Sequence, residues 1–283
     1  MKPLDPAWLD AQYNNRARVP GYARFLERWA QASALARERL SRRLDLRYGD
    51  GPNETLDLFP SPSANAPVLV FIHGGYWRAL DKSDQSFVAP AFLAAGAMVV
   101  LPNYELCPSG TVETISLQMA RAVAWVWRHA ALYGGDPRRI VVAGHSAGGH
   151  LAAMMAACDW KRVGADLPER LIAGSLALSG LFELEPIRHT PFLQGDLRLT
   201  PEMVARTSPA RFKDPGGVLH AWVGGDESEE FHRQNDLIRQ QWGSRTVPVC
   251  AAAPGTNHFT VLHELATPDS AVHGSALDLL GLR

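Results

Sequence analysis

Short apolar runs alternate along the chain with longer stretches of helical periodicity. Alternation of strands with helices is typical of a mostly parallel sheet with helices on both faces. Because no helical stretch separates the first two runs, we expect them to form an antiparallel hairpin at an edge of the sheet. The runs predict strands at residues 44–48, 55–59, 68–72, 98–101, 140–143, 172–177, 219–223 and 247–251. The helical periodicity predicts helices at residues 84–95, 112–133, 147–158, 229–242, 260–265 and 275–280.

The first 43 residues do not fit this repeating unit. They contain an arginine-rich stretch with helical spacing, so a basic arm for nucleic acid is one interpretation. Glu27, Glu38 and an apolar stripe interrupt the basic residues, which favours a docked helix that covers the sheet or the site. The predicted stripe consists of Phe25, Trp29, Ala32, Ala36 and Leu40.

Residues 181–212 form a second irregular segment. They contain four prolines and a short helical pattern near residues 202–207. A long connection of this kind between two strands is typical of a lid. We therefore predict a small helical cap, or lid, inserted between two strands.

The composition and charge of the chain indicate which kinds of binding partner to expect. The chain has 283 residues, 46% of them hydrophobic, which is ample for a packed core. With 28 basic and 29 acidic residues, no bulk charge attracts nucleic acid or an anionic membrane. We therefore expect a small-molecule substrate as the partner, with neither nucleic acid nor membrane, and leave open a homodimer.

Cysteine usage and apolar run length bear on location. The three cysteines are widely spaced, so a disulfide framework is not expected. The first residues lack the apolar segment of a secretory signal, and no apolar run approaches the roughly 20 residues of a membrane helix. We expect a cytoplasmic protein.

A serine follows the predicted strand at residues 140–143 and opens the next predicted helix. It lies at the centre of the pentapeptide Gly144-His145-Ser146-Ala147-Gly148. A G-x-S-x-G sequence between a strand and a helix is the pattern of a nucleophile elbow, in which a sharp turn exposes the hydroxyl. The five letters alone are weak evidence, so partners for the serine must be found elsewhere in the chain.

A serine nucleophile needs a base, and the base needs an orienting carboxylate. Asp226 follows the predicted strand at 219–223, and His258 follows the strand at 247–251, in the order expected of this fold. Glu227 and Glu229 are alternatives for the acid, and His263 is the alternative for the base. We predict Asp226, because the two glycines before it suit a turn that presents it first.

We expect no metal and no cofactor. His145 and His150 flank the serine, but neither a zinc-binding spacing nor a dinucleotide motif is present. The predicted chemistry therefore depends on side chains and backbone amides.

The sequence HGGYW directly follows the predicted strand at 68–72. Glycines let a backbone approach a substrate oxygen without obstruction by side chains. We predict that the N–H groups of Gly75, Tyr76 and Ala147 form an oxyanion hole. Gly74 would allow the bend, and His73 would support the loop through hydrogen bonds.

These motifs together resemble a known family. H-G-G-x-W followed by G-x-S-x-G, with YGGDPRRIVVAGHSAGGHLAA around the serine, is similar to the hormone-sensitive-lipase-like esterase branch of the α/β-hydrolases. Within that branch, the H-G-G-x-W form resembles the kynurenine formamidase family. Where the esterases usually have D-Y-x-L-A-P, this chain has NYELCP, a difference outside the predicted catalytic groups.

The resemblance implies a fold, an active site and an activity. It implies an α/β-hydrolase fold: one domain over residues 1–283, with a mostly parallel eight-stranded sheet, flanking helices and a small cap. It implies the triad of Ser146, Asp226 and His258, with the oxyanion hole in the HGGYW loop. The activity implied is hydrolysis of N-formyl-L-kynurenine to L-kynurenine and formate through a seryl intermediate.

Tyr76, Trp77 and Phe182 are the predicted lining of an aromatic substrate pocket, and Arg188 and Arg206 are candidates for a substrate carboxylate. A carboxylesterase for small aryl or short-chain esters is the alternative function. A non-catalytic binding protein on the same scaffold is a remote alternative, because no triad member is missing.

Overall fold

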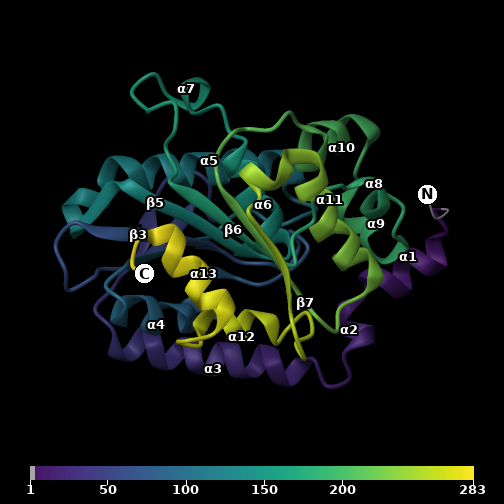
Figure 1. Cartoon of the computed structure of the whole chain (residues 1–283), viewed down its shortest axis with the longest axis horizontal. Coiled ribbons are helices and arrows are strands. Elements are labelled where there is room, and N and C mark those ends of the chain that lie inside the picture. The colour runs from purple at the N-terminus through teal and green to yellow at the C-terminus, as the bar shows by residue number, and fades with distance from the viewer. Residues whose placement is uncertain (1–3) are drawn as a thin grey trace.

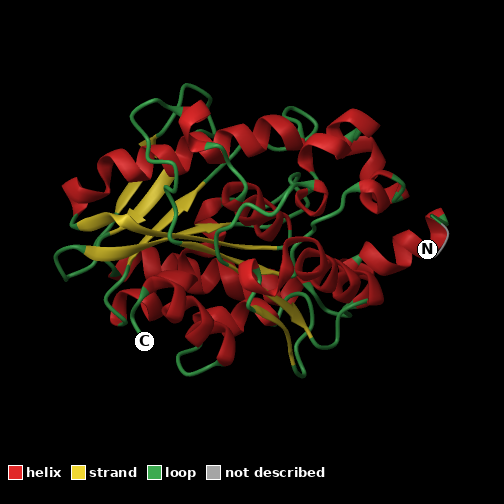
Figure 2. Cartoon of the chain, turned by 45° about the horizontal axis from the view of Figure 1, so that its top comes forward, coloured by secondary structure: helices red, strands yellow, loops and turns green. Residues whose placement is uncertain are grey.

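The computed structural model describes residues 4–283 and shows a sheet enclosed between two layers of helices (Figures 1 and 2). Eight strands lie in the order β1-β2-β4-β3-β5-β6-β7-β8. The fold is that of an α/β-hydrolase, as predicted. The strands are β1 Arg43–Arg47, β2 Thr55–Phe59, β3 Ala66–Ile72, β4 Met98–Pro102, β5 Gly135–His145, β6 Gly174–Leu178, β7 Leu219–Gly224 and β8 Val249–Ala253.

One strand of the sheet, β2, runs opposite to the other seven. From β4 to β8, neighbouring strands are parallel. β1 and β2 form an antiparallel hairpin at the edge, and β2 is antiparallel to β4. The predicted edge hairpin is confirmed. Because the parallel strands all end on one side, the loops after β3, β5, β7 and β8 meet there.

Two helical layers bury the sheet on both faces, which is why β3 and β4 are buried along their whole length. One layer contains α3, α4, α12 and α13, and the other contains α5, α6 and α11 (Figure 1). The bounds are α3 Ala23–Arg39, α4 Ala89–Ala94, α5 Val112–His129, α6 Ala147–Ala156, α11 Glu229–Thr246, α12 Val261–Ala266 and α13 Ala271–Leu280.

Every predicted strand overlaps an observed one, and the predicted helices in the body of the fold are present. Two of them divide into a 3₁₀ turn and an α-helix: Lys82–Val88 precedes α4, and Ala130–Tyr133 follows α5. The short helix α7, Trp160–Val163, was not predicted.

The N-terminal segment contains two helices besides α3, namely α1 Pro6–Tyr13 and α2 Asn15–Arg18. On α3 the buried positions are Trp29, Ser33 and Ala36, whereas Ala32 is exposed. The predicted stripe is therefore wrong at Ala32. Ser33 replaces it in the interface because its hydroxyl accepts a hydrogen bond from the Phe87 N–H at 3.0 Å.

The segment 181–212 forms three short helices and a 3₁₀ turn where one helical piece was predicted. Each of these elements has a proline in its first turn, a position that needs no N–H donor. The prolines therefore start helices here and do not interrupt them. The elements are α8 Glu185–Arg188, α9 Pro191–Leu197, α10 Pro201–Thr207 and the turn Pro209–Arg211.

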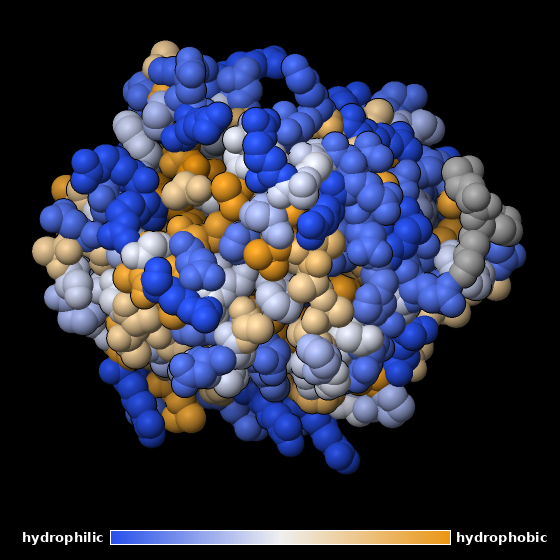
Figure 3. All heavy atoms as spheres, in the orientation of Figure 1, coloured by the Kyte–Doolittle hydropathy of each residue, from blue (hydrophilic) through white to orange (hydrophobic). Residues whose placement is uncertain are grey.

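On the face shown in Figure 3, hydrophobic residues lie in small groups among polar ones, and hydrophilic residues dominate the right-hand side. Among residues 4–283, none of the helices has the length and apolar character needed to span a membrane.

Candidate active site

Ser146 lies in a strained turn between β5 and α6. Its φ of 57° and ψ of −117° are unusual for a residue with a side chain. A Cβ on Gly144 would lie 2.1 Å from the Gly148 carbonyl oxygen, and a Cβ on Gly148 would lie 2.0 Å from the Ile72 carbonyl oxygen. Both glycines are therefore required by backbone contacts, and the sequence pattern is a nucleophile elbow in geometry as well.

The HGGYW loop turns back on itself directly after β3. Gly75, Tyr76 and Trp77 have positive φ values of 101°, 50° and 55°. A Cβ on Gly75 would lie 2.1 Å from the Ala79 carbonyl oxygen, so only glycine fits there. The Arg78 N–H donates to the Gly75 carbonyl at 3.0 Å and closes the turn.

His73 lies beneath this loop and is buried. Its ring nitrogens lie 2.9 Å from the Gly74 carbonyl oxygen and 3.1 Å from Asn103 Oδ1, and its ring stacks on Tyr104 with centroids 4.2 Å apart. Burial lowers the pKa of His73, so its ring is neutral. These contacts are those expected of a residue that supports the loop.

Three backbone N–H groups near Ser146 have no partner in the protein. In the described part of the chain, the amides of Gly75, Tyr76 and Ala147 donate no hydrogen bond. Gly75 and Tyr76 line the same cavity as Ser146. Unpartnered amides at such a point suit stabilisation of a developing oxyanion.

The carboxylate that contacts His258 is that of Glu227. His258 Nδ1 donates to Glu227 Oε2 at 2.7 Å, and both side chains are buried. Glu227 Oε1 accepts hydrogen bonds from the Gly224 N–H at 2.7 Å and from the Ser179 hydroxyl. The prediction of Asp226 in this position is wrong, because Asp226 is exposed and forms no contact with His258.

The turn after β7 explains this correction. The Glu227 N–H donates to the Gly224 carbonyl at 3.1 Å, so residues 224–227 form a turn with Asp226 near its tip. Asp226 is exposed at the tip, whereas the fourth residue, Glu227, returns to the strand end and accepts from the Gly224 N–H. A Cβ on Gly224 would lie 2.9 Å from Glu227 Oε1, so this glycine leaves space for the returning carboxylate.

His145, next to the serine, supports the histidine loop. Its Nε2 donates to the His258 carbonyl oxygen at 2.8 Å, and the two rings lie 4.7 Å apart. Burial, followed by the proximity of His258, lowers the pKa of His145 well below its usual value. A neutral His145 therefore adds no positive charge beside His258.

Ser146 and His258 open into one cavity of about 460 Å³. No hydrogen bond joins their side chains within residues 4–283, and such bonds are commonly long or poorly aligned in free enzymes. Aromatic rings form much of the wall. They come from the N-terminal segment, the HGGYW loop, α9 and the histidine loop: Tyr22, Trp29, Tyr76, Phe192 and Phe259.

Two of the three predicted pocket residues lie elsewhere. Tyr76 lines the cavity, but Trp77 is fully buried against the His150 ring at 5.0 Å. Phe182 is fully buried in a cluster with Ala177 and other residues below the cap. Both predictions are wrong, because each ring is fully buried in a hydrophobic cluster away from the cavity.

The N-terminal segment was expected to cover the sheet or the site, and three of its residues, Tyr22, Leu26 and Trp29, line the cavity, whereas the contribution of α9 to the wall was not predicted. Trp29 was recognised as an apolar helix position, and its indole N–H donates to His263 Nε2 at 2.9 Å while the ring faces the cavity. Of the cap, only Phe192 reaches the cavity. No local sequence signal separates an aromatic residue that packs from one that also borders a cavity.

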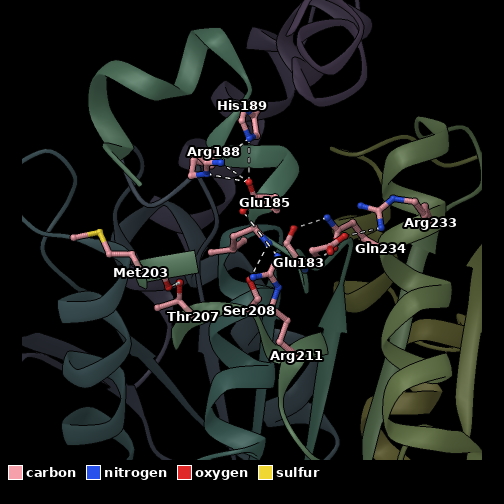
Figure 4. A network of polar contacts seen from close by, with 11 residues as sticks. Glu183, Glu185, Arg188, His189, Met203, Thr207, Ser208, Arg211, Arg233 and Gln234 are labelled. Carbon is pink, nitrogen blue, oxygen red and sulfur yellow. Dashed lines mark hydrogen bonds and ion pairs between the residues drawn. The ribbon is translucent and has the colours of Figure 1, made fainter. Parts of the chain in front are cut away.

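The two predicted carboxylate-binding arginines already have partners. Arg188 contacts Glu185 and His189, as Figure 4 shows. Arg206 forms a bidentate pair with Glu113 on α5. Neither lines the cavity, so both candidates are wrong.

The described residues contain no group of three or more histidine, cysteine, aspartate or glutamate side chains that could hold a metal ion. The arrangement can perform acyl transfer. It has a serine that lines a cavity, a histidine oriented by a carboxylate, and free amides beside them.

Comparison with known proteins agrees with this geometry. The BD-FAE family model matches residues 56–170. The kynurenine formamidase of Danio rerio is 30% identical over 247 residues, which cover 84% of this chain and 82% of that protein. The esterase LipC of Mycobacterium tuberculosis is 34% identical over 155 residues, or 53% of this chain and 38% of that protein.

Solved structures show the same fold. A putative thioesterase from Silicibacter sp. TM1040 has a TM-score of 0.82 at 33% identity, covering 94% of this chain and 97% of that one. A hyperthermophilic esterase from Pyrobaculum calidifontis has a TM-score of 0.73 at 19% identity, covering 100% and 98%. The first resemblance extends to sequence, and the second concerns the fold alone.

Proposed function

Because this chain belongs to the kynurenine formamidase family of α/β-hydrolases, we propose that it hydrolyses N-formyl-L-kynurenine to L-kynurenine and formate. The observation that carries the proposal is the aromatic cavity that holds Ser146 and His258 together. An aryl formamide needs an aromatic cavity for its ring and a small space for its acyl group.

In the first step, Ser146 Oγ attacks the formyl carbon while His258 Nε2 takes the hydroxyl proton. Negative charge moves to the formyl oxygen, where the amides of Gly75, Tyr76 and Ala147 stabilise it. Glu227 accepts the hydrogen bond from His258 Nδ1 and stabilises the imidazolium. Collapse of the intermediate breaks the C–N bond, and His258 returns the proton to the leaving aniline nitrogen.

In the second step, water attacks the formyl ester on Ser146. His258 takes a proton from this water, and the same amides stabilise the second oxyanion. The C–O bond to Ser146 then breaks, the serine oxygen regains its proton from His258, and formate leaves. The aniline of kynurenine is weakly basic, so it is a better leaving group than an alkyl amine.

Hydrolysis of small aryl or short-chain esters is the second candidate. The similarity to the esterase LipC favours it, and the two reactions use the same serine, histidine and amides. The candidates differ in the leaving group, so their relative rates separate them.

The test compares kcat/KM for N-formyl-L-kynurenine with that for p-nitrophenyl acetate, using wild type and Ser146→Ala. We expect a formamidase value of about 10⁴ M⁻¹s⁻¹ or more. Ser146→Ala should remain folded and lose several orders of magnitude in turnover of both substrates. Rapid ester cleavage without formamide cleavage would make the protein an esterase, and retained activity in Ser146→Ala would exclude this nucleophile.

A further inference from the structure

The cavity that holds Ser146 is positively charged on one side. Its lining contains two arginines, Arg16 and Arg78, and, within the described residues, no aspartate or glutamate. The positive charge of Arg78 is compensated by Asp196, and its guanidinium also donates to the Phe192 carbonyl oxygen. The two arginines therefore differ in what they can offer a ligand.

Arg16 has no acidic partner in the part of the chain that the structure describes. Its guanidinium lies over the Tyr22 ring, 5.5 Å from the centroid. This stacking leaves the N–H groups at the edge of the guanidinium plane free to donate. Arg16 is thus an uncompensated cation at the wall of the catalytic cavity.

The neighbouring Asn15 has a buried amide without a partner. Asn15 lines the cavity with a relative exposure of 5%, and its Nδ2 has no hydrogen bond. Buried amides are almost always hydrogen-bonded, so this one is suited to a group that enters the cavity.

Both residues are held in place by the segment that precedes them. The Tyr13 hydroxyl donates to Glu230 Oε2 at 2.7 Å, and the Tyr13 carbonyl accepts from the Tyr76 hydroxyl at 2.7 Å. Asn14 Oδ1 accepts from the Ala17 N–H at 3.1 Å and begins the short helix that carries Asn15. These contacts fix Asn15 and Arg16 relative to the HGGYW loop.

We propose that Asn15 and Arg16 form a subsite for a carboxylate on the leaving group of an aryl formamide. The Arg16 guanidinium and the Asn15 amide N–H would both donate to the carboxylate oxygens, while the reacting bond lies at Ser146. The inference rests on the proposed function, because N-formyl-L-kynurenine carries such a carboxylate on the side chain of its aromatic ring. The subsite would distinguish this substrate from neutral aryl formamides and esters.

The experiment uses two substrates with the same reacting bond. N-formyl-L-kynurenine has the carboxylate, and 2-formamidoacetophenone has the same aryl ketone and formamide without it. For Arg16→Gln we expect kcat/KM for N-formyl-L-kynurenine to fall about 10- to 100-fold, the usual effect of losing a hydrogen bond to a charged group. For 2-formamidoacetophenone we expect kcat/KM to change by no more than about twofold.

Two further variants separate recognition from folding. Asn15→Asp keeps the shape of the side chain and places a negative charge beside the substrate carboxylate. It should therefore lower kcat/KM for N-formyl-L-kynurenine only. Arg18→Gln is the matched control, because Arg18 lies on the same helix but does not line the cavity. Equal losses on both formamides, or an Arg16→Gln value within about twofold of wild type on both, would overturn the subsite.

An inhibition measurement keeps the subsite distinguishable from the proposed function. L-kynurenine and 2-aminoacetophenone are tested as inhibitors of p-nitrophenyl acetate hydrolysis. The subsite predicts that Arg16→Gln raises the inhibition constant of L-kynurenine alone, by about tenfold or more. If wild type cleaves neither formamide, the proposed function fails, and this inhibition pattern decides the subsite: its presence supports the subsite, and its absence overturns it.

Discussion

The carboxylate of Glu227, which orients His258 in the proposed mechanism, is itself firmly held. Its carboxylate accepts hydrogen bonds from His258 Nδ1, the Gly224 N–H and the Ser179 hydroxyl. Donors on both oxygens fix the carboxylate plane, and the plane fixes the tautomer and direction of the imidazole. The acid therefore acts by orientation as well as by charge.

Neighbouring substitutions test this assignment. Glu227→Gln should lower kcat by at least about 100-fold, because an amide that donates toward Nδ1 favours the wrong tautomer. Asp226→Asn should stay within about twofold of wild type, because its side chain is exposed at the turn tip. Steady-state kinetics on p-nitrophenyl acetate measure both, with circular dichroism as the folding control. A larger loss in Asp226→Asn than in Glu227→Gln would reverse the assignment.

At the residue scale, the sequence predicted Ser146 and His258, which lie in one cavity. It did not predict which carboxylate contacts His258. The strand–turn–helix pattern around Ser146 leaves one position for a nucleophile. For the acid, two adjacent carboxylates fit the spacing, and only the backbone hydrogen bond that closes the turn at Gly224 separates them. Such a bond has no signature in the letters of the sequence.

The helix α3 is docked on the sheet by charged and aromatic contacts. Asp57 on β2 is fully buried and contacts Arg37 from α3. Lys82 Nζ lies 2.8 Å from Asp57 Oδ1, and the Asp45 N–H donates to the same oxygen at 3.0 Å. One buried carboxylate therefore joins α3, the edge hairpin and the turn before α4.

Removal of this charge should loosen α3 more than the sheet. Asp57→Asn leaves Lys82 buried with only the exposed Asp45 carboxylate, and it leaves Arg37 without its partner. We expect a loss of about 3 kcal/mol in the free energy of unfolding, the usual cost of an uncompensated buried charge. Urea unfolding measures the loss, and hydrogen exchange should show the largest increase within α3.

The control for this substitution is Glu38→Gln, since Glu38 lies on the exposed side of α3. Its free energy of unfolding should differ from wild type by less than about 0.5 kcal/mol. Equal hydrogen exchange in α3 of wild type and Asp57→Asn would show that the carboxylate does not hold this helix.

At the element scale, strands were easier to predict than the cap. Fully buried strands appear as continuous apolar runs of the length found in β3 and β4. In the cap, the three α-helices span no more than seven residues and have a proline at the first or second position, so neither periodicity nor proline position distinguishes them from loops.

Over the whole molecule, several histidines are buried in the neutral form. Burial lowers the pKa of His73, of His145, and of His150, the last to about 4. In the unfolded chain these groups bind protons near the ordinary value of about 6.5. Below that pH the unfolded state binds more protons than the folded state, so stability falls as the pH is lowered.

The free energy of unfolding should therefore decrease steadily from pH 7 to pH 4.5. His150 alone accounts for roughly 2.5 kcal/mol of this decrease. In His150→Gln, which retains a donor for the Thr207 carbonyl, the decrease should be smaller. Urea unfolding at a series of pH values measures both slopes, and a wild-type free energy that is constant between pH 7 and pH 5 would contradict the prediction.

The order of synthesis has a consequence for the wall of the cavity. Trp29 leaves the ribosome early, whereas its hydrogen-bond partner His263 is 234 residues further along the chain. The apolar side of α3 packs mainly against the turn Lys82–Val88, which is made early, whereas the hydrogen bond from Trp29 to His263 can form only late in synthesis. The wall of the cavity around Ser146 is therefore complete only when the loop that carries His258 and Phe259 has been made.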